Sequence, residues 1–299
     1  MDYEEFKLVI RAELQKNYQE EAEIEISEVL KNNGRSYDGI RITLGKECRN
    51  PTPIIDLSSF YEDYYNGKFD IAGCVEEIME ERNNHVCPEG LDEFAGKIVD
   101  WEYVKENVYP ILLSTKENKQ MLKNLVSIPL LDLSVGYIIR DDVMEECRSS
   151  AKITKPMLKC YGVNKEQLHK QAIENLNKDG YQFQNMNELI KCLRGTVEDG
   201  EELASGMEMY VLTNTSKLYG AAGILSQQLL KNFAGERDFF ILPSSVHECI
   251  FVPVVDMGAK GAFDMMVREV NTEEVGVEER LSDHCYYYDA KENEIRMCA

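Results

Sequence analysis

The order of strands and helices in the last third of the chain constrains the fold most strongly. Two apolar runs at residues 239–242 and 248–255 flank a short polar turn, so we expect them to pair as a hairpin. The flanking predicted elements are a strand at 209–213, a helix at 221–233, a helix at 262–270 and strands near 285–288 and 294–297. This β-α-β-β-α-β order, with a last strand added, predicts an antiparallel sheet with helices on one face.

Helix and strand signals also alternate in the rest of the chain. Residues 3–14 have the spacing of an amphipathic helix, and a predicted hairpin follows, with strands at 24–30 and 37–44 joined through Asn32, Asn33 and Gly34. Further predicted elements are helices at 57–65, 71–82, 101–107, 115–125, 155–160 and 165–176, a loop at 85–96, and strands at 108–114 and 128–140, the last bending at Gly136.

These elements predict an α+β (mixed α/β) protein with antiparallel or mixed sheets. A chain of 299 residues is long for one small core, so we expect two lobes. The first is an N-terminal α/β lobe at residues 1–150, and the second is a C-terminal α+β lobe at residues 151–299.

The charge of the chain excludes one class of partner. Asp and Glu number 54 against 33 Lys and Arg, which gives a formal charge of -21 and a pI near 4.7. Such a surface repels phosphate backbones, so we expect no direct nucleic-acid binding. The same charge could attract a basic protein or let an acidic face imitate DNA, although it more often serves solubility.

The cysteines and the N-terminal sequence predict the compartment. Nine cysteines stand at irregular spacings without the close pairs of a zinc site, and an odd number of them does not indicate a disulfide framework. Residues 1–10 are acidic and amphipathic, unlike a signal peptide, and no apolar run reaches membrane-spanning length. We therefore expect a soluble cytoplasmic protein with reduced thiols, no metal and no membrane association.

The turn at residues 243–249 is the most concentrated group of polar residues. It contains Ser244, Ser245, His247 and Glu248, which are the side-chain types of a hydrolase nucleophile, base and acid. Neighbouring strand residues point to opposite faces, however, so Glu248 should point away from His247. Serines also satisfy tight turns locally, which favours a structural role, and His247 is the best single catalytic candidate.

A glycine-containing segment after the predicted strand 209–213 stands where phosphate-binding loops occur. It lacks both the G-x-G-x-x-G fingerprint and the P-loop lysine followed by Ser or Thr, so no cofactor is expected. Gly220 and Gly223 more simply let the following helix approach the sheet closely.

Several segments together carry a family resemblance. They are Leu218-Tyr219-Gly220-Ala221, the run 241–248, the run 266–271, Leu281-Ser282-Asp283 with Tyr286, Tyr288 and Asp289, and Pro129 to Asp132. Over about residues 100–299 the chain resembles domain-of-unknown-function (DUF) family number 5688, of hypothetical proteins from gut clostridia. The resemblance implies no activity. Cys249 departs from it, because an aliphatic residue is expected there.

No complete catalytic or cofactor motif is present, so the preferred hypothesis is a non-enzymatic cytosolic interaction or regulatory protein with a protein partner. The first alternative is a small-molecule enzyme, hydrolase-like, with His247 as base, Ser244 or Ser245 as nucleophile and Glu248 or a distant acid orienting the base. The second is an acidic protein that imitates DNA.

Overall fold

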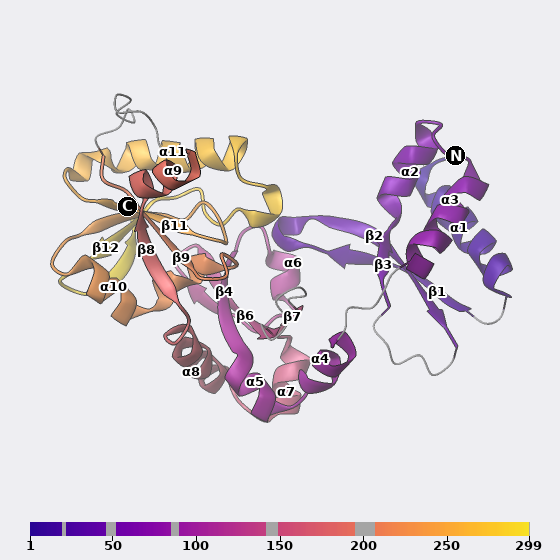
Figure 1. The fold of residues 1–299 in the computed structure, drawn as a ribbon, viewed down its shortest axis with the longest axis horizontal. Helices are drawn as coiled ribbons and strands as arrows, with labels where there is room; N and C mark the ends of the chain where they lie inside the picture. Colours follow the sequence, from indigo (N-terminus) through magenta and orange to yellow (C-terminus); the bar gives the residue numbers. More distant parts are fainter. Residues whose placement is uncertain (20–21, 46–51, 85–89, 142–148, 195–206, 299) are drawn as a thin grey trace. The chain divides into compact units, whose positions relative to one another are not determined.

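The computed structural model describes residues 1–19, 22–45, 52–84, 90–141, 149–194 and 207–298. The chain forms two compact units. Unit 1 falls within Met1–Lys31, Arg35–Lys97 and Val143–Ser149, and unit 2 falls within Asn32–Gly34, Ile98–Asp142 and Ser150–Ala299. Figure 1 gives the element labels. The division into lobes at residue 150 stays a prediction about folding domains.

Unit 1 is a three-stranded antiparallel sheet covered by helices. Its elements are α1 Tyr3–Tyr18, β1 Ala22–Leu30, β2 Ser36–Leu44, β3 Ile54–Asp56, α2 Leu57–Tyr65, α3 Ile71–Asn84 and α4 Leu91–Lys97. The strand order is β1-β2-β3. Phe6, Ile10 and Leu14 recur every four residues on α1 and are fully buried, which confirms the predicted amphipathic helix and its core face.

One element of unit 1 corrects the sequence reading. The sequence predicts a loop through residues 91–96, but residues 91–97 form α4, which buries Phe94 and carries Asp92 and Glu93 in its first turn. Acidic residues near a helix N-terminus interact favourably with the exposed backbone N–H groups there. Pro88 and Gly90, the helix-breaking residues on which the predicted loop rests, thus both precede the first residue of α4.

The first sheet of unit 2 has four strands. The elements of this region are α5 Trp101–Asn107, β4 Val108–Ser114, α6 Lys119–Leu122, β5 Ile128–Leu130, β6 Leu133–Asp141, β7 Ser149–Lys152, α7 Lys155–Tyr161 and α8 Lys165–Leu176. The strand order is β4-β6-β5, and β7 also pairs with β6. The helix expected at 115–125 is only the short α6.

A tight turn replaces the single strand expected at residues 128–140. Leu131 has a φ of 54°, in the left-handed region, and the chain reverses there so that β5 pairs antiparallel with β6. Gly136, where the sequence predicts a bend, lies inside β6 opposite Ile111. The turn presents Asp132 at the end of the hairpin.

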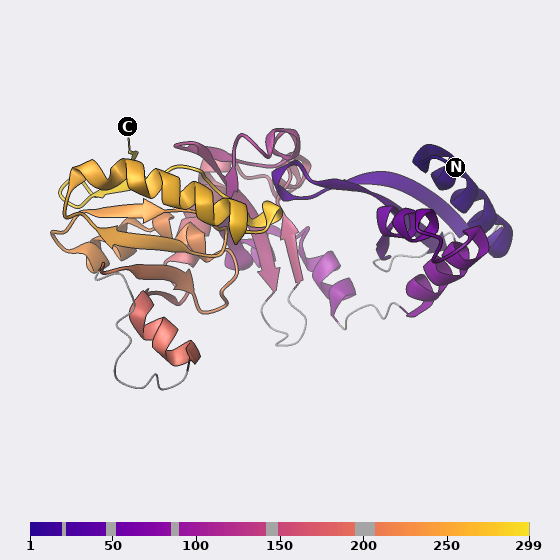
Figure 2. The same ribbon diagram turned by 90° about the horizontal axis from the view of Figure 1, so that it is seen from above.

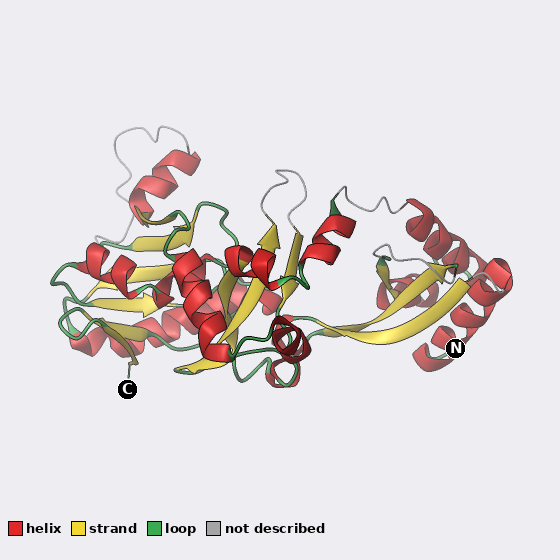
Figure 3. Ribbon diagram, turned by 90° about the horizontal axis from the view of Figure 1, so that it is seen from below, coloured by secondary structure: helices red, strands yellow, loops and turns green. Residues whose placement is uncertain are grey.

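The second sheet of unit 2 has six strands. Its elements are β8 Tyr181–Asn185, α9 Met186–Arg194, β9 Tyr210–Asn214, η3 Gly220–Leu225, α10 Gln227–Ala234, β10 Phe239–Leu242, β11 Cys249–Pro253, α11 Lys260–Glu273, β12 Tyr286–Asp289 and β13 Glu294–Met297. The order is β13-β12-β10-β11-β9-β8, with antiparallel pairing throughout (Figure 3). This confirms the antiparallel sheet and the predicted element order.

The helix expected at residues 221–233 is divided. Residues 220–225 form the 3₁₀ helix η3, and α10 begins after Ser226, whose hydroxyl accepts a hydrogen bond from the Leu229 backbone N–H at 3.1 Å. A serine at this position satisfies an N–H that has no partner within the helix. The Ser226 cap therefore begins a separate helix, although the spacing of apolar residues alone predicts one continuous helix over 221–233.

The helices α10 and α11 lie on opposite faces of the six-stranded sheet. The ring of Phe233 on α10 is 5.0 Å from that of Phe239, whereas Phe263 on α11 is 5.0 Å from the next strand residue, Phe240. Successive strand residues point to opposite faces. Figure 2 shows α11, in yellow, along one side of the sheet. The expectation of helices on one face is corrected in this detail, because β10 is apolar on both faces.

Candidate functional site

His247 lies in the loop between β10 and β11, and both of its ring nitrogens have partners. Nδ1 accepts a hydrogen bond from the Tyr219 backbone N–H at 3.4 Å, and Nε2 lies 3.4 Å from Oε1 of Glu279. Since Nδ1 is an acceptor here, the ring proton belongs on Nε2, where it faces the carboxylate. The imidazole thus ties the start of η3 to the segment that contains Glu279.

The two predicted nucleophiles lie in the same loop but make other contacts. Ser245 Oγ accepts from the backbone N–H of His247 at 3.0 Å, and the Ser244 carbonyl accepts from the Leu281 N–H at 3.1 Å. Both serines are buried. For either hydroxyl to donate to Nδ1 of His247, it would have to displace the Tyr219 amide. The catalytic roles of these residues therefore stay a prediction, and this geometry supplies no direct support for them.

Burial is the main influence on the pKa values of the two residues that follow His247, which are Glu248 and Cys249. It raises the pKa of the Glu248 carboxyl. Cys249 is fully buried, with Sγ 3.9 Å from the Ala221 carbonyl oxygen, and burial raises the pKa of its thiol. A thiol held protonated in an apolar site is a poor nucleophile, so Cys249 acts as a core residue.

Residues 277–284, which we call the junction segment, run beside the His247 loop. The segment begins with η5 Val277–Glu279. The Val246 N–H donates to the Glu279 carbonyl at 2.8 Å, and the Ser282 N–H donates to the Pro243 carbonyl at 3.1 Å. An isolated antiparallel bridge joins Ser245 to Arg280. These backbone hydrogen bonds hold the loop in place, which explains its buried serines without catalysis.

Asp132 accepts hydrogen bonds from two hydroxyl groups, one on the junction segment and one on β12. Ser282 Oγ donates to Oδ2 at 2.7 Å, and the Tyr286 hydroxyl donates to Oδ1 at 2.5 Å. The Tyr286 ring is fully buried, and burial, followed by the nearby charge of Asp132, raises the pKa of its hydroxyl. The phenol therefore stays protonated and remains a donor to the carboxylate.

Asn271, near the end of α11, holds the same segment from another direction. Its Nδ2 donates to the Ser282 carbonyl and to Oδ1 of Asp283, both at 2.9 Å. The side chain is almost completely buried, and its Oδ1 has no hydrogen-bond partner among the described residues. A buried asparagine with both donor contacts used is a structural cross-link between a helix and a loop.

Asn33 provides a third anchor, and it lies in the turn between β1 and β2, a turn that belongs to unit 2. Its Nδ2 donates to the carbonyls of Val277 and Arg280, both at 2.7 Å. The Asn33 backbone N–H donates to Oδ1 of Asn118 at 2.8 Å, and Nδ2 of Asn118 donates to Oδ1 of Asn33 at 2.7 Å. Asn33 has a φ of 58°, which Asn adopts more readily than most residues. The sequence indicates a turn here but not these contacts.

A cavity of about 360 Å³ lies beside these anchors. Its lining is Asn33, Ser114, Lys116, Glu117, Asp132, Asn271, Val277, Arg280, Leu281, Ser282, Asp283 and His284. Basic and acidic side chains both line it, so the cavity favours no single charge of ligand. The segments quoted for the family resemblance, including Pro129 to Asp132 and residues 266–271, meet at this junction.

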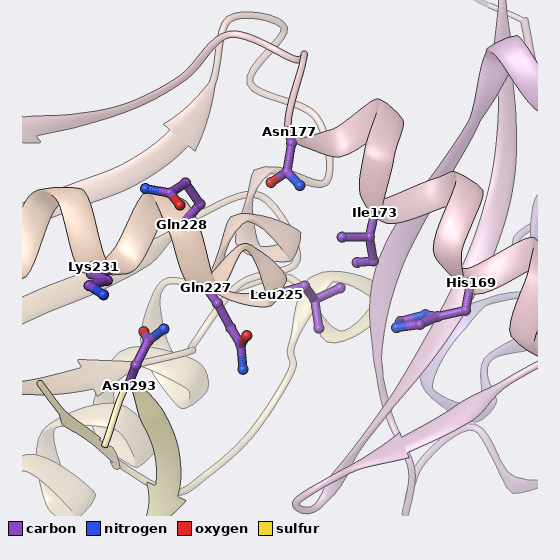
Figure 4. Close-up of a pocket in the computed structure, with 8 residues that line it drawn as sticks. All are labelled: His169, Ile173, Asn177, Leu225, Gln227, Gln228, Lys231 and Asn293. Atoms are coloured by element: carbon purple, nitrogen blue, oxygen red, sulfur yellow. The ribbon is translucent and has the colours of Figure 1, made fainter. Parts of the chain in front are cut away.

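A larger cavity of about 610 Å³ lies between α8, α10 and the turn between β12 and β13 (Figure 4). Its lining is His169, Ile173, Asn177, Leu225, Gln227, Gln228, Lys231 and Asn293. The His169 ring points into it, and Nδ1 lies 3.0 Å from the Tyr137 hydroxyl. Burial lowers the pKa of His169, which favours the neutral ring. Carboxamides and one lysine could bind an uncharged or anionic polar molecule, and no sequence motif points to this site.

Two features are absent from the part of the chain that the structure describes, namely a cluster of metal-ligating side chains and a membrane-spanning helix. Within it, no three His, Cys, Asp or Glu side chains are grouped as metal ligands. Among the helices of the same residues, none has the length and apolar character to cross a membrane.

Comparison with known proteins gives one match. A family model, "Family of unknown function (DUF5688)", matches residues 3–290, so the likeness includes the N-terminal helix and hairpin as well as the region from residue 100 onward. The family resemblance is confirmed, and an origin in gut clostridia stays a prediction. No curated protein and no solved structure matches the chain.

Proposed function

The chain belongs to the DUF5688 family of unknown function, and we propose that it is a non-enzymatic interaction or regulatory protein of the cytoplasm that binds a protein partner. The observation that carries this proposal is a set of exposed apolar side chains on α11 and immediately before it. They are Val255, Met257, Met265 and Met266, which we call the methionine surface.

The methionine surface faces away from the core. Val255 is 95% exposed and Met265 is 65% exposed. The buried residues of α11, Phe263, Val267 and Asn271, recur every four positions and define its other side. Large apolar side chains in water favour association, and methionine adapts its flexible side chain to varied apolar surfaces.

The charges around the methionine surface select the kind of partner. Residues 255–274 contain the acidic residues Asp256, Asp264, Glu269, Glu273 and Glu274 and the basic residues Lys260 and Arg268, so five negative charges against two positive ones leave a net charge of -3. The complementary occupant is a basic amphipathic segment of a partner protein, with apolar side chains on the methionines and Lys or Arg near the carboxylates. Such binding weakens as salt concentration rises.

A photo-reactive amino acid at position 265 tests the proposal in living cells. The matched control carries the same amino acid at Met207, which is also an exposed methionine but lies outside α11. We expect position 265 to cross-link one protein through a basic amphipathic segment, and position 207 not to do so. With that partner purified, the double variant Met265→Gln and Met266→Gln should bind more weakly than Met207→Gln.

Three outcomes would contradict the proposal. The first is equal cross-linking at positions 265 and 207. The second is a partner whose binding is indifferent to the methionine substitutions and to salt. The third is turnover of a metabolite by the purified protein without any partner, which would favour the hydrolase-like alternative. A captured nucleic-acid-binding protein that DNA displaces would instead favour the imitation of DNA.

A further inference from the structure

Two cysteine thiols face each other at the edge of the described six-stranded sheet. Cys285 precedes β12 and Cys298 follows β13, and their Sγ atoms are 3.6 Å apart. The Cys298 N–H donates to the Cys285 carbonyl at 3.2 Å, which continues the pairing of Tyr286 with Met297 by one position. The two cysteines are therefore directly opposite one another on adjacent antiparallel strands.

We propose that Cys285 and Cys298 form a reversible disulfide, so that this pair is a redox modification site linking β12 to β13. Hydrogen-bonded residues opposite each other in an antiparallel sheet have Cα atoms about 5.5 Å apart. Disulfide-bonded cysteines have Cα separations of about 4.4–6.8 Å. The strands are thus already at the required spacing, and only the side chains must close to about 2.05 Å between sulfurs.

The two thiols differ in accessibility, which sets the order of the reaction. Cys285 is fully buried, in a cluster with Phe240, Phe263 and Val267, and Cys298 packs against that cluster while partly exposed. An oxidant from solution therefore meets Cys298 first, and the buried partner completes the bond. Burial raises the pKa of both thiols, which slows each attack, but the 3.6 Å between their sulfur atoms makes the second attack intramolecular, with a partner of a kind that Cys249 is not shown to have.

The oxidant is a low-molecular-weight disulfide such as glutathione disulfide. The Cys298 thiol loses its proton, and its sulfur attacks one sulfur of the oxidant and releases one glutathione thiolate, which takes up a proton. The Cys285 thiol then loses its proton and attacks Sγ of Cys298, which releases the second glutathione. Two thiols and one glutathione disulfide give one protein disulfide and two glutathiones, so two electrons pass from the protein to the oxidant.

The location gives the modification a structural consequence. The Cys285 N–H donates to Oδ1 of Asp264 on α11 at 2.7 Å, and the cysteine packs beneath that helix with Phe263. A bond to Cys298 would hold the edge strand β13 onto β12 and fix this part of the core. The inference is independent of the proposed partner, because the disulfide can form whether or not α11 binds another protein.

Peptide mapping of the full chain tests the proposal. The reduced protein is incubated with glutathione disulfide, in buffer or in urea, alkylated and digested with trypsin, which cuts after Arg280, Lys291 and Arg296. In the folded protein we expect the dominant cross-link to join the peptide 281–291 to the peptide that begins at Met297. Urea should abolish this preference. Closing the loop should also raise the midpoint of thermal unfolding by several degrees, and dithiothreitol should reverse the rise.

Single substitutions separate the two steps. Cys285→Ser should leave Cys298 as a stable glutathione adduct, whereas Cys298→Ser should leave Cys285 unmodified. Cys160→Ser, which removes an exposed cysteine elsewhere, is the matched control and should keep the cross-link. The proposal is overturned if the wild-type chain accumulates only the adduct at Cys298. It is also overturned if the cross-link forms as readily in urea as in the folded protein.

Discussion

Replacing Tyr286 with Phe removes a single hydroxyl that donates to the Asp132 carboxylate in a partly buried site. A hydrogen bond to a charged group contributes about 1.5–3 kcal/mol, so we expect Tyr286→Phe to lower the free energy of unfolding by about 2 kcal/mol. Tyr288 on the same strand supplies the matched control. Its ring is equally buried, but its hydroxyl donates to the neutral Asn293 amide oxygen at 2.7 Å, so Tyr288→Phe should cost about 1 kcal/mol.

Urea unfolding monitored by tryptophan fluorescence measures this difference in unfolding free energy for unit 2, which contains both Asp132 and Tyr286. Trp101 is the only tryptophan of the chain, and it lies in unit 2 with its ring 5.8 Å from that of Tyr161. Its emission therefore reports the unit that contains the Asp132 network. Equal slopes of free energy against urea concentration in the variants would show that the comparison concerns the same transition.

A double-mutant cycle with Asp132→Asn tests the cause. If the charged acceptor is responsible, the penalty of Tyr286→Phe should shrink when Asp132→Asn is already present, with a coupling of about 0.5–3 kcal/mol. The reasoning fails if Tyr286→Phe costs no more than Tyr288→Phe, or if its penalty is the same with and without Asp132→Asn.

Three further substitutions test other parts of the structure. Gly220→Ala would place a Cβ 2.4 Å from the His247 carbonyl oxygen and 2.9 Å from the Asn214 backbone nitrogen, so it should cost at least about 1–3 kcal/mol by urea unfolding, whereas Gly261→Ala, with open space around it, should not destabilise. Phe251→Ala empties a buried site against Phe233 and Phe239, and calorimetry should show a loss of about 3–5 kcal/mol. Burial lowers the pKa of His169 in the folded protein below 6.5, so as pH falls the unfolded chain binds a proton at this residue before the folded protein does. The contribution of the neutral ring to the free energy of unfolding is therefore complete above about pH 6.5 and is lost as pH falls through the pKa of the folded state. His169→Gln should therefore flatten the fall in the urea midpoint between about pH 7.5 and pH 5, and an unchanged slope would refute the assignment.

Local patterns predict most elements because their causes are local. The fourfold spacing of Phe6, Ile10 and Leu14 defines the buried face of α1, and the Asn-Gly turn at 32–34 fits the hairpin of β1 and β2. Two of the errors occur where one residue interrupts a continuous apolar pattern. Leu131 reverses the chain between β5 and β6, and Ser226 caps a new helix after η3. Leucine does not signal a turn, since a left-handed conformation is unfavourable for it without surrounding contacts.

The candidate site was only partly predictable. The sequence draws attention to the polar loop at 243–249, and its segments of family resemblance include most of the residues that meet at the junction. It does not indicate that His247 lies beside Glu279, or that Asp132 accepts hydrogen bonds from Ser282 and Tyr286. These partners are separated by 32 to 154 positions along the chain. No local periodicity records which distant loops the sheet brings together.

The sequence by itself determined the α+β class, the antiparallel order of the C-terminal sheet, the acidic charge and the lack of a recognisable catalytic motif. These properties follow from side-chain chemistry and from spacings of two to four residues, which act within one strand or one helix turn. Only the tertiary structure decided that α10 and α11 cover opposite faces, that Asn33 and Asn271 anchor the junction segment, and that the thiols of Cys285 and Cys298 face one another. Those contacts depend on strand register and on how elements distant in sequence pack, and one position of slip in register would turn every side chain of a strand to the other face.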